Sequence, residues 1–572
     1  MKRSYRPWSP GAGKPAGAVR LFQFAVALSL LSAGLNVRAG APAGNADPKK
    51  VAFFHGTIGT EVMPLPVAQV LPDLYPQHFK PLGKDAGDWI DQFGFIRRDD
   101  VAADVPPGSD AEAGGLPLGF TVSNLTPGTG APSPVKFVGI GCATCHTTRI
   151  RRSIDDRGVL VVGTGNPALN MFAWLDAFQA ATLQKLPDLT APKDPARVRL
   201  PLGVEESELL TVDKVAEKYR ARSGKDLTDV EKTAIGGWLQ GIALQQAATI
   251  PRFDQPYGNG RSIEPGIVPT GPGRTQPFRT LVRNVLNRPG SSMQVFTKVA
   301  PVYQEDLLVW AQVDGGIKDL RIRSALAAMA AGASVEILDK DTVVKNIEDA
   351  TDYTRKLAGP RYEKVFPDLF ALLDGEAVQR GQMSYMKHCA YCHGRPEKVA
   401  PGGWSPMGQD SRLGAIIPYE EIGTDPERVT FRYFDELPDE IFAKFPSSHH
   451  FAFKREALRP GPLGTRKGYI TKPLDSAFSR APYLHNASVL TLAELINLRP
   501  RRAVVYRGNV AIYDPENLGI YSPDSADRVY YFEFDTSLRG NSNAGHDYPW
   551  AYKGPGWDER ELRDLLEYLK TL

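Results

Sequence analysis

Two five-residue stretches of this chain share one pattern: Cys142–His146 reads CATCH, and Cys389–His393 reads CAYCH. Both follow C-x-x-C-H, which is the attachment signature of c-type haem. Two thiols one helical turn apart can add to the two vinyl groups on one edge of a porphyrin, and the adjacent imidazole then ligates the iron from the proximal side. The attaching residues would be Cys142, Cys145, Cys389 and Cys392. The sequence therefore predicts two covalently bound haem c groups, with His146 and His393 as the proximal iron ligands.

Three other interpretations of the cysteines fit less well. A disulfide framework is natural in an oxidising compartment, but 4 cysteines are few for 572 residues, and two tight C-x-x-C loops would staple almost nothing. A zinc site would need the two pairs about 15–20 residues apart, whereas they begin at residues 142 and 389. A thioredoxin-like pair would not explain the histidine after both motifs.

The N-terminus has the pattern of an export signal. A basic lead precedes the mostly apolar run 21–31, and Val37-Arg38-Ala39 gives a small-x-small cleavage site. The apolar run is shorter than the ~20 residues that a spanning helix needs. We therefore expect residues 1–39 to be a cleaved signal peptide, with an uncleaved anchor as the alternative. The mature protein would lie in the periplasm or outside the cell, with no membrane span.

The composition is that of a soluble globular protein. Hydrophobic residues make up 42% and charged residues 23% of the chain, and the formal net charge is +3. No basic cluster indicates a nucleic-acid partner or a charged membrane surface. Glycine (54) and proline (47) are abundant, which indicates long ordered loops.

The two haem motifs suggest how the chain is divided. At roughly 150 residues per domain the chain is too long for one small electron carrier, and we expect an N-terminal haem c domain at 40–335 and a C-terminal haem c domain at 336–572. Hydrophobic periodicity predicts a helix at 168–185. Further helices are expected at 205–222, 229–248 and 490–498, and another at 375–388 would lead into the second haem motif, as is usual in c-type domains. A last helix, capped by Asp558, carries the apolar stripe Leu562–Leu572. With short hairpins near 503–513 and 528–534, the predicted fold is mainly α with extensive ordered loops.

Several further stretches carry a family resemblance. They are GCATCHT at 141–147, GNPA at 165–168, GPGR at 271–274, EIGTDP at 421–426, APYLHN at 481–486 and DTSLRGNSNAGH at 535–546. On these residues the chain resembles the di-haem cytochrome c peroxidase superfamily, and within it the rubber-oxygenase-like branch of latex-cleaving and fatty-acid di-haem dioxygenases. The chain departs from many relatives at Phe478, where tryptophan is common, at Ala487, where glycine is usual, and at Leu490, where proline is usual.

The resemblance also implies site residues. It assigns the distal ligand of the second haem to His546, in a glycine- and asparagine-rich run that can bring the backbone close to a porphyrin; a surface-loop histidine is the alternative. Trp310 is a candidate catalytic aromatic near the first haem or between the haems, or else plain core. Arg274 is a candidate partner for a haem propionate or a substrate carboxylate. We expect His485 to lie near the haem without ligating it.

The sixth coordination positions decide the function, because a six-coordinate haem passes electrons and an open one can bind oxygen or peroxide. The leading hypothesis is a dioxygenase that inserts O₂ at the N-terminal haem into an apolar or amphipathic alkene, either an unsaturated fatty acid or polyisoprene. One alternative is a peroxidase, in which the second haem feeds electrons to the first for reduction of hydrogen peroxide. The other is a non-enzymatic electron carrier. A redox partner protein belongs to both alternatives.

Overall fold

The computed structural model describes residues 46–572 apart from 81–86, 109–112, 188–197, 202–203, 250–267, 287, 289–292, 398–402, 453–466, 525–530 and 549–556. The predicted signal peptide 1–39 lies outside the described residues, as does most of the proline- and glycine-rich segment 251–277. The described residues belong to one unit of the chain, Ala46–Leu572. No helix among them is both long enough and apolar enough to cross a membrane.

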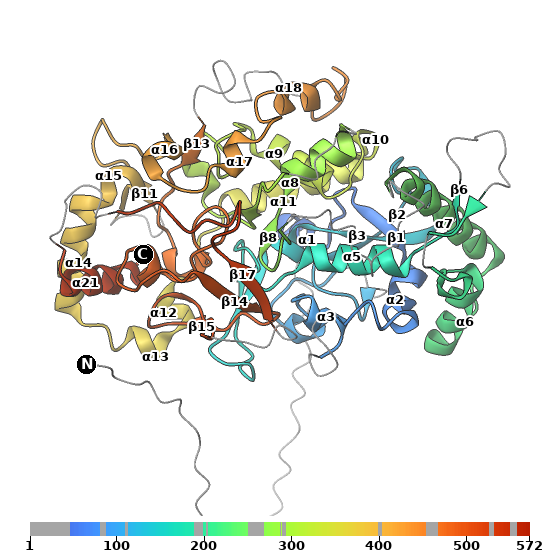
Figure 1. Ribbon diagram of the computed structural model, residues 1–572, viewed down its shortest axis with the longest axis horizontal. Helices are drawn as coiled ribbons and strands as arrows, with labels where there is room; N and C mark the ends of the chain where they lie inside the picture. Colours follow the sequence, from blue (N-terminus) through green and yellow to red (C-terminus); the bar gives the residue numbers. More distant parts are fainter. Residues whose placement is uncertain are drawn as a thin grey trace, which may run out of the picture. The chain divides into compact units, whose positions relative to one another are not determined.

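A three-stranded antiparallel sheet leads into the first haem motif (Figure 1). Its order is β1 (Glu61–Pro64), β3 (Pro132–Ile140), β2 (Phe120–Leu125). The central strand β3 pairs through Gly139 with Glu61 on one side and with Thr121 on the other. Since β3 ends at Ile140, the chain passes directly from the sheet into the short helix α4 (Cys142–Cys145), which holds the motif.

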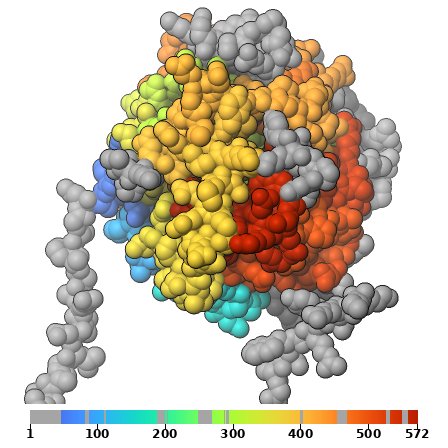
Figure 2. Space-filling view, turned by 90° about the vertical axis from the view of Figure 1, so that its left-hand side faces the viewer, coloured from blue at the N-terminus to red at the C-terminus, as the bar shows by residue number. Residues whose placement is uncertain are grey.

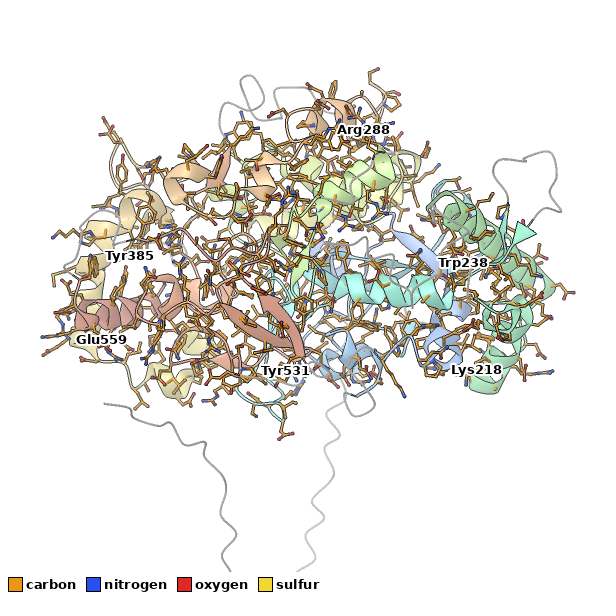
Figure 3. The ribbon with its side chains drawn as sticks, in the orientation of Figure 1. Lys218, Trp238, Arg288, Tyr385, Tyr531 and Glu559 are labelled. Carbon is orange, nitrogen blue, oxygen red and sulfur yellow. The ribbon has the colours of Figure 1, made fainter. Side chains whose placement is uncertain are left out.

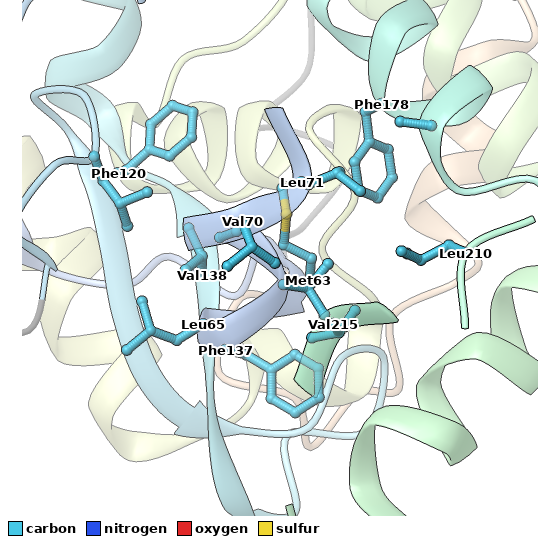
Figure 4. Packing of buried hydrophobic residues seen from close by; sticks show 14 of the residues in the cluster. Met63, Leu65, Val70, Leu71, Phe120, Phe137, Val138, Phe178, Leu210 and Val215 are labelled. Carbon is cyan, nitrogen blue, oxygen red and sulfur yellow. The ribbon is translucent and has the colours of Figure 1, made fainter. Parts of the chain in front are cut away.

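Helices cover this sheet and form the first core (Figure 4). They are α2 (Leu65–Leu74), α5 (Met171–Ala181), α6 (Val212–Ser223) and α7 (Asp229–Thr249). Met63, Leu71, Phe137, Phe178 and Val215 from these helices and strands pack together in one buried cluster. Burying each such side chain contributes about 1.5–3 kcal/mol, so this cluster fixes the sheet and the helices on one side of the first motif.

Two other clusters draw on both halves of the chain. Ile58 and Ile337 pack with Phe431 and Leu437, while Ile150 belongs to a cluster made mostly of C-terminal residues. The helices of the first of these clusters are α9 (Leu320–Ala330), α10 (Val335–Leu338), α11 (Asp341–Arg355) and α18 (Leu437–Phe442). The boundary expected between 335 and 336 falls inside α10, so the division into two haem domains stays a prediction.

The second motif follows α14 (Gly375–His388), as the sequence predicted, and occupies α15 (Ala390–His393). Helix α21 (Glu559–Leu569) lies along α14, and their residues share one face of the molecule (Figure 2). Asp374 and Asp558 cap the two helices. Arg380 on α14 donates to both carboxylate oxygens of Asp564 on α21, at 2.7 and 3.1 Å.

Gly381 makes the close approach of α14 and α21 possible, because a Cβ there would lie 1.9 Å from the carbonyl oxygen of Asp564. We expect Gly381→Ala to lower the free energy of unfolding by about 1–3 kcal/mol, the usual cost of overpacking, measured as a fall in the denaturant midpoint. Gly375→Ala on the same helix is the matched control, because a Cβ there meets nothing within 4 Å. Equal midpoints for the two variants would contradict this account of the helix pair.

The other elements are short. The two-stranded ladders are β4 (Thr147–Ile150) with β5 (Val159–Val162), β6 (Leu186–Pro187) with β7 (Val198–Arg199), β8 (Arg274–Thr275) with β9 (Thr297–Lys298), β10 (Arg395–Pro396) with β11 (Trp404–Ser405), and β12 (Ile416–Pro418) with β13 (Gly468–Ile470). The short helices include α1 (Pro48–His55), α3 (Trp89–Gln92), α8 (Pro277–Thr280), η4 (Leu281–Val285), η5 (Glu305–Leu307), α12 (Tyr362–Val365), α13 (Pro367–Phe370), α16 (Tyr419–Ile422), α17 (Glu427–Thr430), η7 (Ala477–Arg480) and α19 (Leu492–Leu495).

One predicted helix and the predicted hairpins differ from the structure. The helix expected at 205–222 is split into η3 (Glu206–Glu208) and α6, because Thr211 caps a new helix. The hairpins expected near 503–513 and 528–534 are wrong as drawn: β14 (Val504–Gly508) pairs with β17 (Tyr531–Asp535) in one antiparallel ladder. Tyr513 instead starts β15 (Tyr513–Asp514), which pairs with β16 (Gly519–Ile520).

Candidate functional site

The first motif is a single helical turn held against the sheet. The backbone N–H of His146 donates to Cys142 at 3.0 Å, so the motif closes one turn. Gly119, with φ +82°, passes so near that a Cβ would lie 2.1 Å from the Thr144 nitrogen. No disulfide joins the cysteines, and burial raises the pKa of the Cys142 thiol to about 11 and that of the Cys145 thiol to about 12.

His146 is fixed in one tautomer. Its Nδ1 lies 3.1 Å from the Ala300 carbonyl oxygen, and since a carbonyl only accepts, Nδ1 carries the proton. Burial lowers the pKa of His146 to about 4, and the cation of Arg323 adds to this effect. The imidazole is therefore neutral with an unprotonated Nε2, which is the form that ligates a metal.

A large cavity adjoins this histidine, here called the His146 cavity. Its volume is about 1630 Å³ and its lining includes Cys145 and His146. Ligand pockets usually measure roughly 300–1,000 Å³, so the space is large enough for a porphyrin and for a second ligand. Much of the wall is apolar: it includes Ile140, Leu169, Phe172, Phe178, Trp238 and Ile242. The only histidine among the described lining residues is His146, and the only methionine is Met171.

Several charged residues that line the His146 cavity are removed from solvent. Arg323 donates to both carboxylate oxygens of Glu305, at 2.7 and 2.6 Å, and both residues line the His146 cavity. Two lysines line it as well: burial lowers the pKa of Lys298 to about 7 and that of Lys472 to about 8. Lys298 donates to the carbonyl oxygens of Arg480 and Pro482. These cations suit the propionates of a haem, whose two carboxylates need positive partners in a buried site.

Sequence reasoning missed Glu305, Arg323, Lys298 and Lys472. Each lies in a separate segment, and no local motif marks any of them. The one usable signal was proximity to a resembling stretch, because Lys472 lies shortly before APYLHN at 481–486.

The second motif has a matching arrangement. His393 lies with its Nδ1 2.7 Å from the carbonyl oxygen of Lys472, so its Nε2 is also left unprotonated. Burial lowers the pKa of His393 and raises that of the Cys389 thiol to about 12. The backbone carbonyl of Lys472 thus holds the second histidine, and Lys472 also lines the His146 cavity.

His546 lies opposite His393. The two ring centroids are 6.1 Å apart, with an angle of 49° between the ring planes. Two metal–nitrogen bonds of about 2 Å each, with about 1.1 Å from each nitrogen to its ring centre, add to about 6.2 Å, so the spacing fits one metal between the rings. The Nδ1 of His546 is buried without a partner among the described residues. Burial and the neighbouring His393 lower the pKa of His546 to about 3, which keeps it neutral.

The loop that carries His546 is held from several sides. His546 itself has φ +56°, a left-handed conformation, and its N–H donates to Ile422 at 2.7 Å. Gly545 passes so close to Gly423 that a Cβ would lie 2.4 Å from its carbonyl carbon. Arg501 donates to the carbonyl oxygens of Asn543 and Gly545. The left-handed conformation of a non-glycine residue costs about 1–3 kcal/mol, and such conformations persist at functional sites where the surrounding contacts stabilise them.

Arg274 is also part of this support. Its guanidinium is buried between the rings of Phe296 and Phe534, at 4.0 and 4.3 Å from their centroids. It donates to Asn541 Oδ1 at 2.7 Å, and thereby ties the His546 loop to β8. Its other nitrogens donate to the carbonyl oxygens of Pro269 and Thr270. Arg274 lines the His146 cavity, and its propionate or substrate contact stays a prediction.

Two candidates from the sequence remain, Trp310 and His485. Trp310 is half-buried in a loop and is not among the described lining residues, although Gln312 and Asp314 are. His485 is buried and stacks on Tyr469 at 4.3 Å between centroids, and its backbone carbonyl accepts from Lys298 at 2.6 Å. Both roles, Trp310 as an active aromatic and His485 as a non-ligand, stay predictions.

The structure shows the surroundings of the three residues at which the chain departs from the family pattern. Phe478 is fully buried and meets Tyr362 edge-on at 5.2 Å. Ala487 has φ +63°, which is the conformation that favours glycine. Leu490 donates its backbone N–H to Glu494 at 3.2 Å, a bond that proline could not make.

Comparison with known proteins agrees with this chemistry. Residues 468–507, which contain Lys472 and His485, match a family model described as RoxA-like, cytochrome c-like. The uncharacterized protein y4iJ of Sinorhizobium fredii (strain NBRC 101917 / NGR234) is 26% identical over 558 residues, which covers 85% of each chain. The uncharacterized protein y4iM of the same strain is 26% identical over 234 residues, or 35% of this chain and 49% of that protein. The match supports the resemblance to the rubber-oxygenase-like branch and indicates a haem-dependent oxidoreductase with covalently bound haem c.

The described residues fit haem c at both motifs. Each motif presents two thiols and a neutral histidine whose Nε2 is left unprotonated by its carbonyl partner. The unpartnered Nδ1 of the buried His546 and the large His146 cavity are the observations that the group would explain.

Proposed function

We propose that this chain is an exported oxidoreductase with two haem c groups, and that it acts as a dioxygenase on an apolar alkene at the His146 site. The carrying observation is the contrast between the two sites. His393 has His546 opposite it, at a spacing at which the two imidazoles could hold one metal ion between them. His146 faces a large cavity whose described lining contains no second histidine.

The residues of the chain would perform three tasks. His146, kept neutral by burial, would hold the first haem, and His393 with His546 would hold the second. A bound haem c supplies the redox chemistry with dioxygen. The apolar walls from α5 and α7 would exclude water and hold a carbon chain, while Glu305 and Arg323 fix the charge near His146.

Peroxide reduction is the second candidate, and Glu61 is the observation that favours it. Glu61 lines the His146 cavity, and its Oε1 accepts from Thr57 and Ser123. Its Oε2 is buried with no hydrogen-bond partner among the described residues. A carboxylate in this position could move a proton to or from an oxygen of peroxide.

An oxygen electrode separates the two functions. We expect the purified protein to consume dioxygen when given oleate or polyisoprene with no added electron donor, because a dioxygenase puts both oxygen atoms into its product. A peroxidase must instead draw two electrons per peroxide from a donor. No oxygen uptake with any alkene, together with rapid peroxide turnover fed by a reduced cytochrome, would move the chain to the second candidate.

A further inference from the structure

Tyr469 on β13 and His485 form a buried, hydrogen-bonded pair. Their rings stack at 4.3 Å between centroids, with an angle of 20° between the ring planes. The tyrosine hydroxyl lies 3.1 Å from Nε2 of the histidine. The two residues are 7% and 8% exposed. A phenol and an imidazole held in this way can exchange a proton directly, without a solvent molecule between them.

This pair is connected to the first motif through β9 and the residues that follow it. The backbone N–H of Lys298 donates to the carbonyl oxygen of His485 at 2.6 Å. Two residues later, the carbonyl oxygen of Ala300 accepts from Nδ1 of His146 at 3.1 Å. The connection from His485 to His146 therefore consists of covalent bonds and two hydrogen bonds.

The same pair is connected to the second motif through β13. Three residues after Tyr469, the carbonyl oxygen of Lys472 accepts from Nδ1 of His393 at 2.7 Å. Figure 3 shows that the surroundings of the two motifs lie apart: Tyr385, on the helix before the second motif, and Trp238, which lines the His146 cavity, are in different parts of the molecule. The stacked pair thus belongs to a continuous bonded path between the two proximal histidines.

The hydroxyl proton of Tyr469 has two acceptors within reach, Nε2 of His485 and the carbonyl oxygen of Asp425 at 3.0 Å. Burial raises the pKa of Tyr469 well above its usual value. Burial also lowers the pKa of His485 well below its usual value, and the cation of Arg428 adds to this effect. The resting pair is therefore a neutral phenol beside a neutral imidazole. Loss of an electron changes this balance, because an oxidised phenol is a strong acid and gives its proton to the nearest base.

Two neighbouring buried tyrosines lack such a base. The hydroxyl of Tyr513 donates to the carbonyl oxygen of Phe478 at 2.9 Å. The hydroxyl of Tyr483 reaches only backbone carbonyl oxygens, among them that of Leu518 at 3.0 Å. Within the described part of the chain, neither hydroxyl has a side-chain base at hydrogen-bonding distance. A carbonyl oxygen does not take up a proton near neutral pH, so these two phenols are much harder to oxidise than Tyr469.

We propose that Tyr469 is a redox-active residue and that His485 takes up its proton. The inference rests on the proposed function, because it requires haem at both motifs. The oxidant is hydrogen peroxide, whose reduction to water takes up two electrons and two protons. A bound haem supplies one electron and solvent supplies the protons, while Tyr469 supplies the other electron. Its own proton moves to Nε2 of His485, and a neutral phenoxyl radical remains. An electron from the second site restores the phenol, and the proton returns from His485.

Electron paramagnetic resonance of the haem-loaded protein tests the proposal. We expect the wild type, frozen after mixing with equimolar hydrogen peroxide, to show a free-radical signal. The signal should narrow when the protein is made with ring-deuterated tyrosine, which identifies a tyrosyl radical. Tyr469→Phe should lose the signal, because phenylalanine retains the stacked ring and removes the hydroxyl. Haem content and the low-spin haem signals should be unchanged in this variant, which shows that it is folded and loaded.

Tyr513→Phe is the matched control and should retain the radical, since it removes a buried hydroxyl that has no base beside it. His485→Gln should lose the radical, because glutamine keeps a hydrogen-bonding group but takes up no proton. This second variant decides the matter if Tyr469→Phe fails to bind its haems. Persistence of the signal in Tyr469→Phe or in His485→Gln, or its loss in Tyr513→Phe, would overturn the proposal.

The outcome also separates this inference from the proposed function. Oxygen uptake with alkenes by a wild type that forms no tyrosyl radical would remove the redox-active tyrosine and leave the dioxygenase. A radical that depends on Tyr469, without oxygen uptake, would keep the redox-active tyrosine and move the function to peroxide reduction.

Discussion

Cys389→Ala combined with Cys392→Ala should halve the haem that stays bound to the protein after acid–acetone extraction. Only thioether bonds survive that treatment, and the double variant removes both thiols of the second motif while leaving Cys142 and Cys145 intact. The haem content per chain, measured as the pyridine haemochrome, should fall from two to one. The remaining haem should keep the ligand-binding behaviour of the His146 site, because that site's lining contains neither cysteine of the second motif.

Met383→Ala is a suitable control, since Met383 lies on α14 before the motif and is 65% exposed. It should retain both haems. Two extraction-resistant haems in the cysteine variant, or bound zinc in place of haem, would refute the assignment of the second motif.

His546→Ala should convert one low-spin haem signal into a form that binds external ligands such as cyanide. The reason is the position of His546 opposite His393: both imidazoles would hold the second haem, and the variant would keep only His393 for this task. The change should involve close to one of the two haems in the EPR spectrum. His546→Gly is an informative companion, because residue 546 has φ +56° and glycine adopts this conformation without the strain of about 1–2 kcal/mol that other residues incur.

His485→Ala is the control for this experiment. The ring of His485 stacks on Tyr469, and its Nε2 lies 3.1 Å from the tyrosine oxygen. We therefore expect both haem signals to survive His485→Ala. A new high-spin signal in this variant, with none in His546→Ala, would mean that the two loops have exchanged roles.

The elements that could be predicted from sequence are those with local causes. Helix α21 was predicted because Asp558 can cap a helix and because leucines recur along one face, and the structure has this cap. Helix α14 was expected because a helix usually leads into the haem motif of a c-type domain. The approach of His546 to His393 was implied by the family resemblance alone, since 153 positions of chain separate them and no periodicity links them.

The features that could not be predicted from the sequence depend on contacts between segments that are far apart in the chain. The pairing of β14 with β17 has no turn signal, because the two strands are joined by a long intervening segment rather than by a tight turn. The Glu305–Arg323 pair and Lys472 are ordinary charged residues in sequence, and they matter only because folding buries them beside His146. Burial of a charge is a property of the assembled core, which no local pattern reports.

The composition of the His146 cavity has a consequence for how the protein matures. A chain emerges from synthesis with its N-terminus first, so Cys142–His146 is available long before Phe431, Lys472 and Phe532, which complete the cavity wall. The pocket around the first motif cannot close until the C-terminal third of the chain has been made. An attachment machinery therefore has a period in which the thiols are still accessible, and the late segments then enclose the cofactor.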